Sequence, residues 1–147
     1  MMMTSVAARR ALLDRAFAGV MAQDVDAVLR CLTPDAVLVD PHYPVTRMEG
    51  HAAIADGLRW AFGGMKSMGF EVVKYFETAG GESAAVEVAT HHVLRMGDRH
   101  LDFPQVFVAD FTGELLSRMQ AYEPYGPGGP AALFIGAERL RRRLRRG

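Results

Sequence analysis

The sequence predicts a single α+β domain, because three helical segments come first and four strand-like segments follow. In the first half, apolar residues recur at the three- and four-residue spacing of amphipathic helices. In the second half the spacing changes to the alternation of strands, and short glycine-containing turns separate the segments. Such short connections make neighbouring strands antiparallel. We therefore expect helices packed on one face of a curved antiparallel sheet.

Each helix has a recognisable end. The expected helices cover residues 4–21, 25–32 and 52–62. Asp24 is placed to cap the second helix, since its carboxylate can accept the free N–H groups of the next turn. Pro34 ends that helix, because the residue before a proline avoids helical angles. Gly63 and Gly64 form a stop signal for the third helix.

A short apolar run with β-branched residues, at 36–39, is expected to be the first strand. Asp40-Pro41 terminates it. The four later strands are expected at residues 69–77, 83–96, 100–111 and 115–125. Residues 1–130 form the domain under this interpretation, and residues 131–147 form a C-terminal helix with an arginine-rich tail.

Composition favours a globular protein of a reducing compartment. The chain has 147 residues, of which 50% are hydrophobic, as expected for one domain with a real core. The single cysteine, Cys31, excludes an internal disulfide and is expected to pack in the core. No apolar run reaches the length of a signal peptide or a membrane span. We therefore expect a cytoplasmic protein that does not enter a membrane.

Charge is distributed unevenly along the chain. Six of the 17 basic residues lie at 139–146, whereas 16 of the 17 acidic residues lie before Glu138, so the chain up to Gly136 carries a net charge of −5. This sign argues against a nucleic-acid-binding face on the domain. The tail is expected to be solvated beyond a helix that packs on a dimer partner or on the mouth of a cavity. Nucleic acid or acidic membrane binding by the tail stays open.

Several sequence blocks resemble the nuclear transport factor 2-like superfamily, and within it the SnoaL-like polyketide cyclases and ketosteroid isomerase-like proteins. The resemblance covers about residues 4–125 and is carried by residues 24–26, 32–41, 49–54, 103–108 and 118–122. It implies a cone-shaped half-barrel closed by the helices, with a cavity that binds a small lipophilic molecule. It also implies a homodimer that forms through the outer face of the sheet.

Asp40 is the first candidate catalytic residue, since it coincides with the general base of the isomerase-like enzymes. A carboxylate at the mouth of an apolar cavity loses solvation, which raises its pKa and makes it a better base. The alternative is that Asp40 only initiates a turn with Pro41. The isomerase's tyrosine falls here on Ala16, and its acid on Gln105 or Val106, so steroid isomerisation itself is not expected.

One of two adjacent histidines is the second catalytic candidate. Neighbouring strand residues face opposite ways, so either His91 or His92 can face the cavity, but not both. The resemblance favours His91, whereas the apolar alternation Val86, Val88, Leu94 favours His92. We take His91 as the candidate acid/base partner of Asp40.

Further residues are expected to contact a substrate. They are Tyr43, Trp60, Phe103, Gln105, Arg118, Gln120 and Tyr122. Gln120, Tyr122 and Arg118 share one face of the last strand, and a few polar groups in an apolar space are typical of a ligand site. Alternatively, the polar residues are half-exposed sheet residues and Trp60 belongs to the core.

The sequence contains no recognised spacing of metal ligands and no phosphate-binding loop, so neither a metal nor a cofactor is expected. Two functions remain. The first is a cofactor-independent isomerase, cyclase or hydrolase that uses general acid/base catalysis on a small lipophilic substrate. The second is a non-catalytic binding or structural member of the same superfamily.

Overall fold

The computed structural model describes residues 5–123 and 129–146. Its helices are α1 (Val6–Met21), α2 (Val25–Leu29), α3 (Gly50–Gly64) and α4 (Gly129–Arg145), and a 3₁₀ turn, η1, covers Met96–Asp98. Its strands are β1 (Leu32–Val39), β2 (Arg47–Glu49), β3 (Met65–Ser67), β4 (Phe70–Glu77), β5 (Ser83–Leu94), β6 (His100–Thr112) and β7 (Leu115–Tyr122). The predicted α+β class is confirmed.

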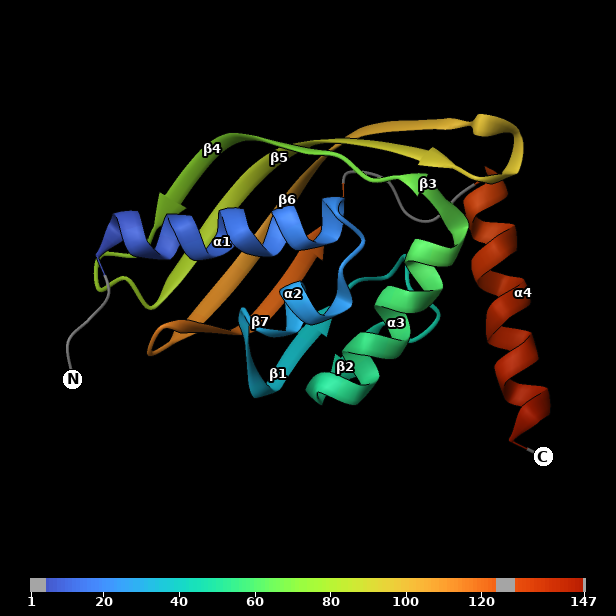
Figure 1. Ribbon diagram of the computed structural model, residues 1–147, viewed down its shortest axis with the longest axis horizontal. Coiled ribbons are helices and arrows are strands. Elements are labelled where there is room, and N and C mark those ends of the chain that lie inside the picture. Colours follow the sequence, from blue (N-terminus) through green and yellow to red (C-terminus); the bar gives the residue numbers. More distant parts are fainter. Residues whose placement is uncertain (1–4, 124–128, 147) are drawn as a thin grey trace.

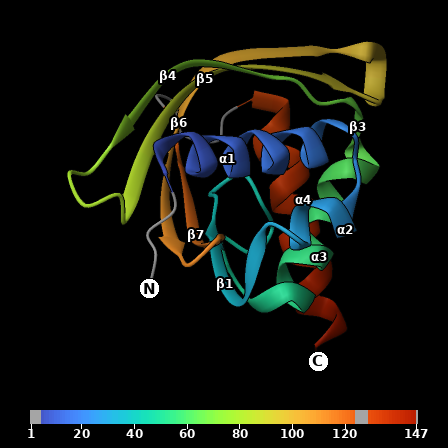
Figure 2. The same ribbon diagram turned by 60° about the vertical axis from the view of Figure 1, so that its left-hand side comes forward.

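All the strands belong to one sheet in the order β2-β1-β7-β6-β5-β3, with β4 also paired to β5. The predicted antiparallel meander is confirmed for β4 to β7, whereas β1 pairs with β7 in parallel. Figures 1 and 2 show the sheet bending around α1 and α2, with α3 and α4 at its far end. The helices therefore close the concave side of an open, curved sheet.

Most predicted boundaries agree with the structure, and the differences have local causes. The side chains of Ser5 and Asp24 accept hydrogen bonds from the first turns of α1 and α2, so Asp24 is the predicted cap. The second helix ends earlier than expected, at Leu29, and Pro34 lies inside β1 rather than at a helix end. The three-residue strands β2 and β3 are too short for alternation to reveal them.

The core lies between α1 and the concave face of the sheet. The ring of Phe17 on α1 lies 5.2 Å from the ring of Phe70 on β4 and 5.3 Å from the ring of Phe107 on β6. Leu13, one turn earlier, is buried in the same cluster, and so is Cys31, as predicted. These contacts fix the direction in which α1 crosses the strands.

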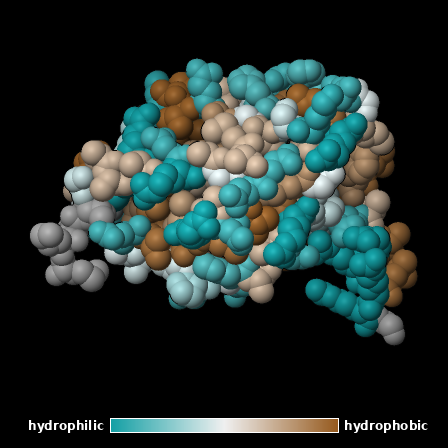
Figure 3. Space-filling view, viewed as in Figure 1, coloured by the Kyte–Doolittle hydropathy of each residue, from teal (hydrophilic) through white to brown (hydrophobic). Residues whose placement is uncertain are grey.

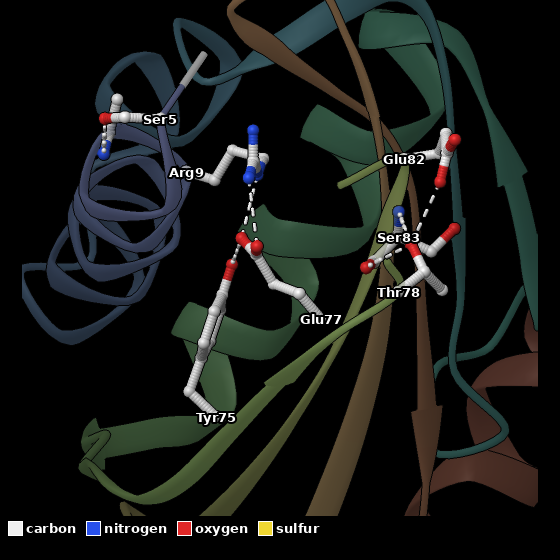
Figure 4. A network of polar contacts seen from close by, with 8 residues as sticks. Ser5, Arg9, Tyr75, Glu77, Thr78, Glu82 and Ser83 are labelled. Atoms are coloured by element: carbon white, nitrogen blue, oxygen red, sulfur yellow. Dashed lines mark hydrogen bonds and ion pairs between the residues drawn. The ribbon is translucent and has the colours of Figure 1, made fainter. Parts of the chain in front are cut away.

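A buried ion pair attaches the first turn of α1 to the end of β4 (Figure 4). Arg9 donates through Nε to Glu77 Oε1 at 2.8 Å and through Nη2 to Oε2 at 2.9 Å. The hydroxyl of Tyr75 donates to Glu77 Oε1 at 2.5 Å. Hydrogen bonding to Arg9 lowers the pKa of Glu77, so this carboxylate stays ionised. The ion pair explains how a charged residue, Arg9, can be buried in this helix.

The predicted C-terminal helix is confirmed, and it includes most of the arginine-rich tail, because it ends at Arg145. Ile135 and Glu138 are buried, whereas Leu133, Leu140 and Leu144 are exposed. In Figure 3, hydrophilic side chains gather along this helix at one edge of the molecule. None of the described helices combines the length and the apolarity that crossing a bilayer requires.

Leu13 provides a direct test of this core. Its side chain is 1% exposed, and we expect Leu13→Ala to lower the free energy of unfolding by about 2–5 kcal/mol, because the lost contacts leave a cavity. The matched variant Leu144→Ala removes a side chain that is 74% exposed and should change stability by less than about 0.5 kcal/mol. Urea unfolding measures both. Equal losses would contradict the packing of α1 described above.

Candidate active site

A cavity of about 720 Å³ lies between the concave face of the sheet, α3 and α4. Its wall is mainly apolar and aromatic, with Phe17, Trp60, Phe70, Phe103, Phe107 and Ile135 among the residues that line it. A small group of polar side chains also lines it, formed by Asp40, His42, His92, Gln105 and Glu123. This composition is typical of a site for a small molecule.

Asp40 forms the turn that one alternative predicted, and it also lines the cavity, as the other alternative requires. It follows β1, is 8% exposed and lines the cavity. Its Oδ1 accepts a hydrogen bond of 2.9 Å from the backbone N–H of His42, which is the turn expected at Asp40-Pro41. Its Oδ2 accepts no hydrogen bond from any described residue. One oxygen therefore holds the turn, and the other is left available.

The imidazole of His42 lies against two carboxylates. Its Nδ1 is 3.7 Å from Asp40 Oδ1 and closer to Glu123 Oε2, although it forms no well-aligned hydrogen bond with either. Asp40 first, and Glu123 next, raise the pKa of His42 to about 9, against the opposing effect of burial. At neutral pH the ring is therefore a cation, and the cluster of Asp40, His42 and Glu123 carries a net charge of −1 when both acids are ionised.

Glu123 is the functional residue that the sequence analysis missed. Its side chain is only 6% exposed, and burial raises the pKa of its carboxyl group. Gln105 donates through Nε2 to Glu123 Oε1 at 2.9 Å, and Gln105 Oε1 accepts from the buried hydroxyl of Thr90 at 3.0 Å. The amide of Gln105 is thus held at both ends. It therefore orients the acid.

His92, rather than His91, faces the cavity. Burial lowers the pKa of His92 to about 4, so its ring is neutral at neutral pH. The backbone N–H of Gly69 donates to His92 Nδ1 at 3.2 Å, which assigns the ring proton to Nε2. His92 therefore brings a neutral N–H donor to the wall of the cavity, between the rings of Phe70 and Phe103.

The expectation that His91 points inward is wrong. His91 lies on the outer face of the sheet, where its exposed side chain pairs with Asp102 at 2.7 Å. The buried residues of β5 are Ala84, Val86, Val88, Thr90 and His92, so the apolar alternation predicted the orientation correctly. The resemblance had assigned the inward position to His91, one residue before the histidine that lines the cavity.

Arg118, Gln120 and Tyr122 also lie outside the cavity. Arg118 and Gln120 hydrogen-bond to each other, and the side chain of Tyr122 is 50% exposed. The strand turns Met119 and Glu123 towards the cavity instead. The three residues do share a face, as predicted, but it is the outer one, so the expectation that they line the cavity is wrong.

Tyr43, Trp60 and Phe103 line the cavity, together with Gln105. The ring of Tyr43 lies 6.1 Å from the ring of Trp60, which joins the loop after β1 to α3. Trp60 also packs against the core, so this residue both lines the cavity and contributes to the core. Burial raises the pKa of Tyr43, so its phenol stays protonated.

The loop that carries His42 and Tyr43 is held by α4. Arg139 donates to the carbonyl oxygens of Pro41, Tyr43 and Pro44 at 3.2 to 3.3 Å. A residue almost one hundred positions away in the sequence therefore supports the turn beside Asp40. The prediction that the terminal helix packs on the cavity is confirmed, because Ile135 of α4 is part of the wall.

In the described part of the chain, Asp40, His42 and Glu123 offer possible metal-ligand atoms within 4.8 Å of one another. Sequence spacing could not reveal this group, because it joins the ends of β1 and β7. A metal would require the neutral form of His42. With its pKa at about 9, the imidazole holds a proton at neutral pH, which a metal ion bound here would have to displace.

The comparisons with known proteins agree with this fold. The family model described as SnoaL-like domain matches residues 13–119. A solved structure from Xanthomonas campestris pv. campestris, a candidate polyketide cyclase, is 17% identical, with a TM-score of 0.69 over 88% of this chain and 96% of that chain. Comparison with the curated proteins gives no match.

Two further structures contain small ligands. A ketosteroid isomerase-like protein from Catenulispora acidiphila, in complex with trimethylamine, is 16% identical, with a TM-score of 0.69 over 78% of this chain and 85% of that chain. A protein from Mycobacterium tuberculosis, in complex with estradiol-17β-hemisuccinate, is 15% identical, with a TM-score of 0.68 over 78% and 92%. At these identities the likeness shows the fold alone.

The charge of His42 gives a pH-dependent stability. Its pKa rises from 6.5 to about 9 on folding, so its contribution is complete below pH 6.5 and is lost as the pH rises through 9. We expect the difference in unfolding free energy between the wild type and His42→Gln to shrink between pH 6.5 and pH 9.5. Urea titrations across this range measure it. A constant difference would show that the two carboxylates do not hold the proton.

Proposed function

Since the chain belongs to the SnoaL-like domain family, we propose that it is a cofactor-independent acid–base enzyme acting on a small lipophilic carbonyl compound. The observation that carries the proposal is the unbonded oxygen of Asp40 at the polar end of a mainly apolar cavity. Similar structures hold small organic ligands, which supports a binding role for the cavity. The proposed reactions are those that begin with removal of a proton next to a carbonyl group, namely isomerisation and cyclisation.

Asp40 is the proposed base. Its Oδ2 is free to accept a proton, while the turn hydrogen bond to Oδ1 keeps the carboxylate in place. The proton moves from the carbon of the substrate to Asp40, and its electron pair becomes an enolate.

His92 is the proposed donor to the enolate oxygen. Its Nδ1 is occupied by the N–H of Gly69, so the proton on Nε2 is the one available to a ligand. Because the pKa of His92 is about 4, its ring is neutral at neutral pH and carries a single N–H, which a neutral imidazole does not lose to the solvent. It can therefore stabilise developing negative charge by hydrogen bonding from a water-poor wall.

His42 and Glu123 form the proposed proton store behind the base. The imidazolium of His42 lies between the two carboxylates, and Gln105 fixes the position of Glu123. After Asp40 takes a proton, the cluster can share it and return it to a different carbon of the enolate. The return completes an isomerisation. In a cyclisation the enolate carbon instead attacks a second carbonyl group of the substrate, and the alkoxide that forms takes the stored proton.

Replacing Asp40 tests the chemistry without a known substrate. We expect the wild type in D₂O to exchange the α protons of some members of a panel of lipophilic ketones and β-keto esters, read by NMR. Asp40→Asn should lower this exchange at least about 100-fold, because it removes the base and keeps the shape of the side chain. His92→Gln should lower it less, because the amide can still donate a hydrogen bond.

Matched controls lie on the other face of the sheet. Asp102→Asn and His91→Gln change the same residue types at an exposed ion pair and should leave the exchange rate unchanged. A folded Asp40→Asn protein that exchanges at the wild-type rate would leave only the binding function. In that case Asp40 would act as a turn residue alone.

We also propose that the chain forms a homodimer through the outer face of its sheet. Val106 lies opposite Tyr122 on β7 and opposite Glu87 on β5, so it faces away from Gln105 and the cavity. Phe76 and Tyr122 on this face are 58% and 50% exposed. A partner that covered these apolar side chains would gain stability from their burial. The buried, unpaired Cys31 fits the proposed cytoplasmic location.

Analytical ultracentrifugation tests this assembly. We expect the wild type to sediment as a dimer at micromolar concentration, and Val106→Arg to sediment as a monomer, because the charge lies at the centre of the proposed interface. Leu133→Arg, on the exposed side of α4, is the matched control and should remain dimeric. A monomeric wild type, or dissociation only by the α4 variant, would refute the sheet interface.

A further inference from the structure

The cavity opens to solvent at one end. Its exposed lining residues lie on the last turns of α3, in the segment just after β5 and at the start of α4. They are Arg59, Gly63, Gly64, Arg95, Met96 and Phe134. By contrast, the lining residues Asp40, Gln105 and His92 are buried. A ligand must therefore enter between α3 and the hairpin that joins β5 to β6.

Two arginines at this opening have no counter-charge within the part of the chain that the structure describes. The side chains of Arg59 and Arg95 form no ion pair and no hydrogen bond with any described residue. Nearby acids are already paired: Asp56, three residues before Arg59, pairs with Arg142 at 2.7 Å, and Asp98 pairs with Lys66 at 2.8 Å. Residues 1–4, 124–128 and 147 contain no acidic side chain that could pair with them.

The two guanidinium groups arise from backbone segments that touch. The backbone N–H of Arg95 donates to the carbonyl oxygen of Gly64 at 3.0 Å. Arg59 lies five residues before Gly64, or about 7.5 Å along the helix axis. Arginine carries its charge on a long, flexible stem, so both groups can reach one anion at the opening.

The cavity thus changes character along its length. The buried end contains the cluster of Asp40, His42 and Glu123, which repels an anion when both of its carboxylates are ionised. The aromatic residues Trp60, Phe70 and Phe103 line the space between, and the arginines hold positive charge at the opening. A ligand that satisfies all three regions is apolar in its middle, anionic at the outer end and polar but uncharged at the inner end.

We propose that the cavity is a binding site for lipophilic anions, with the anionic group held by Arg59 and Arg95. For the inner end the inference rests on the proposed function, since it places the reactive carbonyl group at Asp40. The substrates of the enzyme are then acids, with a carboxylate or phosphate group separated from the reacting carbon by a hydrophobic body. Arg59 and Arg95 determine specificity and do not take part in the chemistry.

A pair of fluorescent probes tests the charge preference. 1-Anilinonaphthalene-8-sulfonate and N-phenyl-1-naphthylamine share one aromatic body, but only the first carries a negative charge. Trp60 is the single tryptophan and lines the cavity, so energy transfer from it reports binding there. We expect the double variant Arg59→Gln, Arg95→Gln to lower the affinity for the sulfonate probe about tenfold and to leave the affinity for the neutral probe unchanged.

Arg99→Gln is the matched control, because Arg99 follows η1 in the same hairpin but does not line the cavity. It should change neither affinity. In the wild type, raising the salt concentration should lower the affinity for the sulfonate probe but not for the neutral probe, so this test requires no variant. Competition by decanoate and by decyl phosphate then identifies which anion is preferred.

Equal weakening of both probes, equal effects of Arg99→Gln, or salt-independent binding of the sulfonate would overturn the inference. These measurements read binding without turnover, so the two proposals can fail separately. Charge-selective binding by a protein that exchanges no α protons would refute the proposed function alone. Asp40-dependent exchange without charge selectivity would refute the anion site alone.

Discussion

Two carboxylates at the polar end of an apolar cavity share one imidazole, and the surrounding structure depends on this sharing. An ionised carboxylate that is removed from water without a partner costs several kcal/mol. Asp40 and Glu123 both lie mostly out of solvent, and His42 lies between them. Removing the imidazole would leave two like charges close together, so the position of His42 must be held firmly.

The support for His42 comes from parts of the chain that are distant in sequence. The turn hydrogen bond from its own N–H to Asp40 fixes the backbone, and Arg139 of α4 binds three carbonyl oxygens of the same loop. On the other side, Thr90 and Gln105 form a buried chain of hydrogen bonds that ends on Glu123. The C-terminal helix, predicted as a segment after the domain of residues 1–130, therefore supports this loop.

The alternation of the sequence predicts correctly which side chains face the cavity where a strand is regular. It predicts the wrong face where a bulge interrupts the strand. In β5 the apolar residues alternate without a break, and counting from Val86 places His92 inside. In β7 the pairing with β6 shifts between Asp110 and Phe111, so that Ser117 has no partner. Counting from the buried Leu116 without this bulge would turn Gln120 and Tyr122 inward.

The same bulge explains why Glu123 was overlooked. Once Ser117 is skipped, Met119 and Ala121 fall on the inner face, and Glu123, directly after the strand, lies beside Asp40. No local pattern marks this position, because the partner strand β1 is more than seventy residues earlier in the chain. The cluster is a product of the parallel pairing of β1 with β7, which periodicity does not predict.

The two histidines of the cavity show how the fold assigns chemical roles. Burial between aromatic rings lowers the pKa of His92 to about 4, whereas two carboxylates raise the pKa of His42 to about 9. Between these values one ring is neutral and the other is charged, whatever the pH within that range. Each ring therefore keeps a single role, because its environment, and not the solution, sets its protonation. A site in which both rings titrated near neutrality would lose one of its two donors as the pH changed.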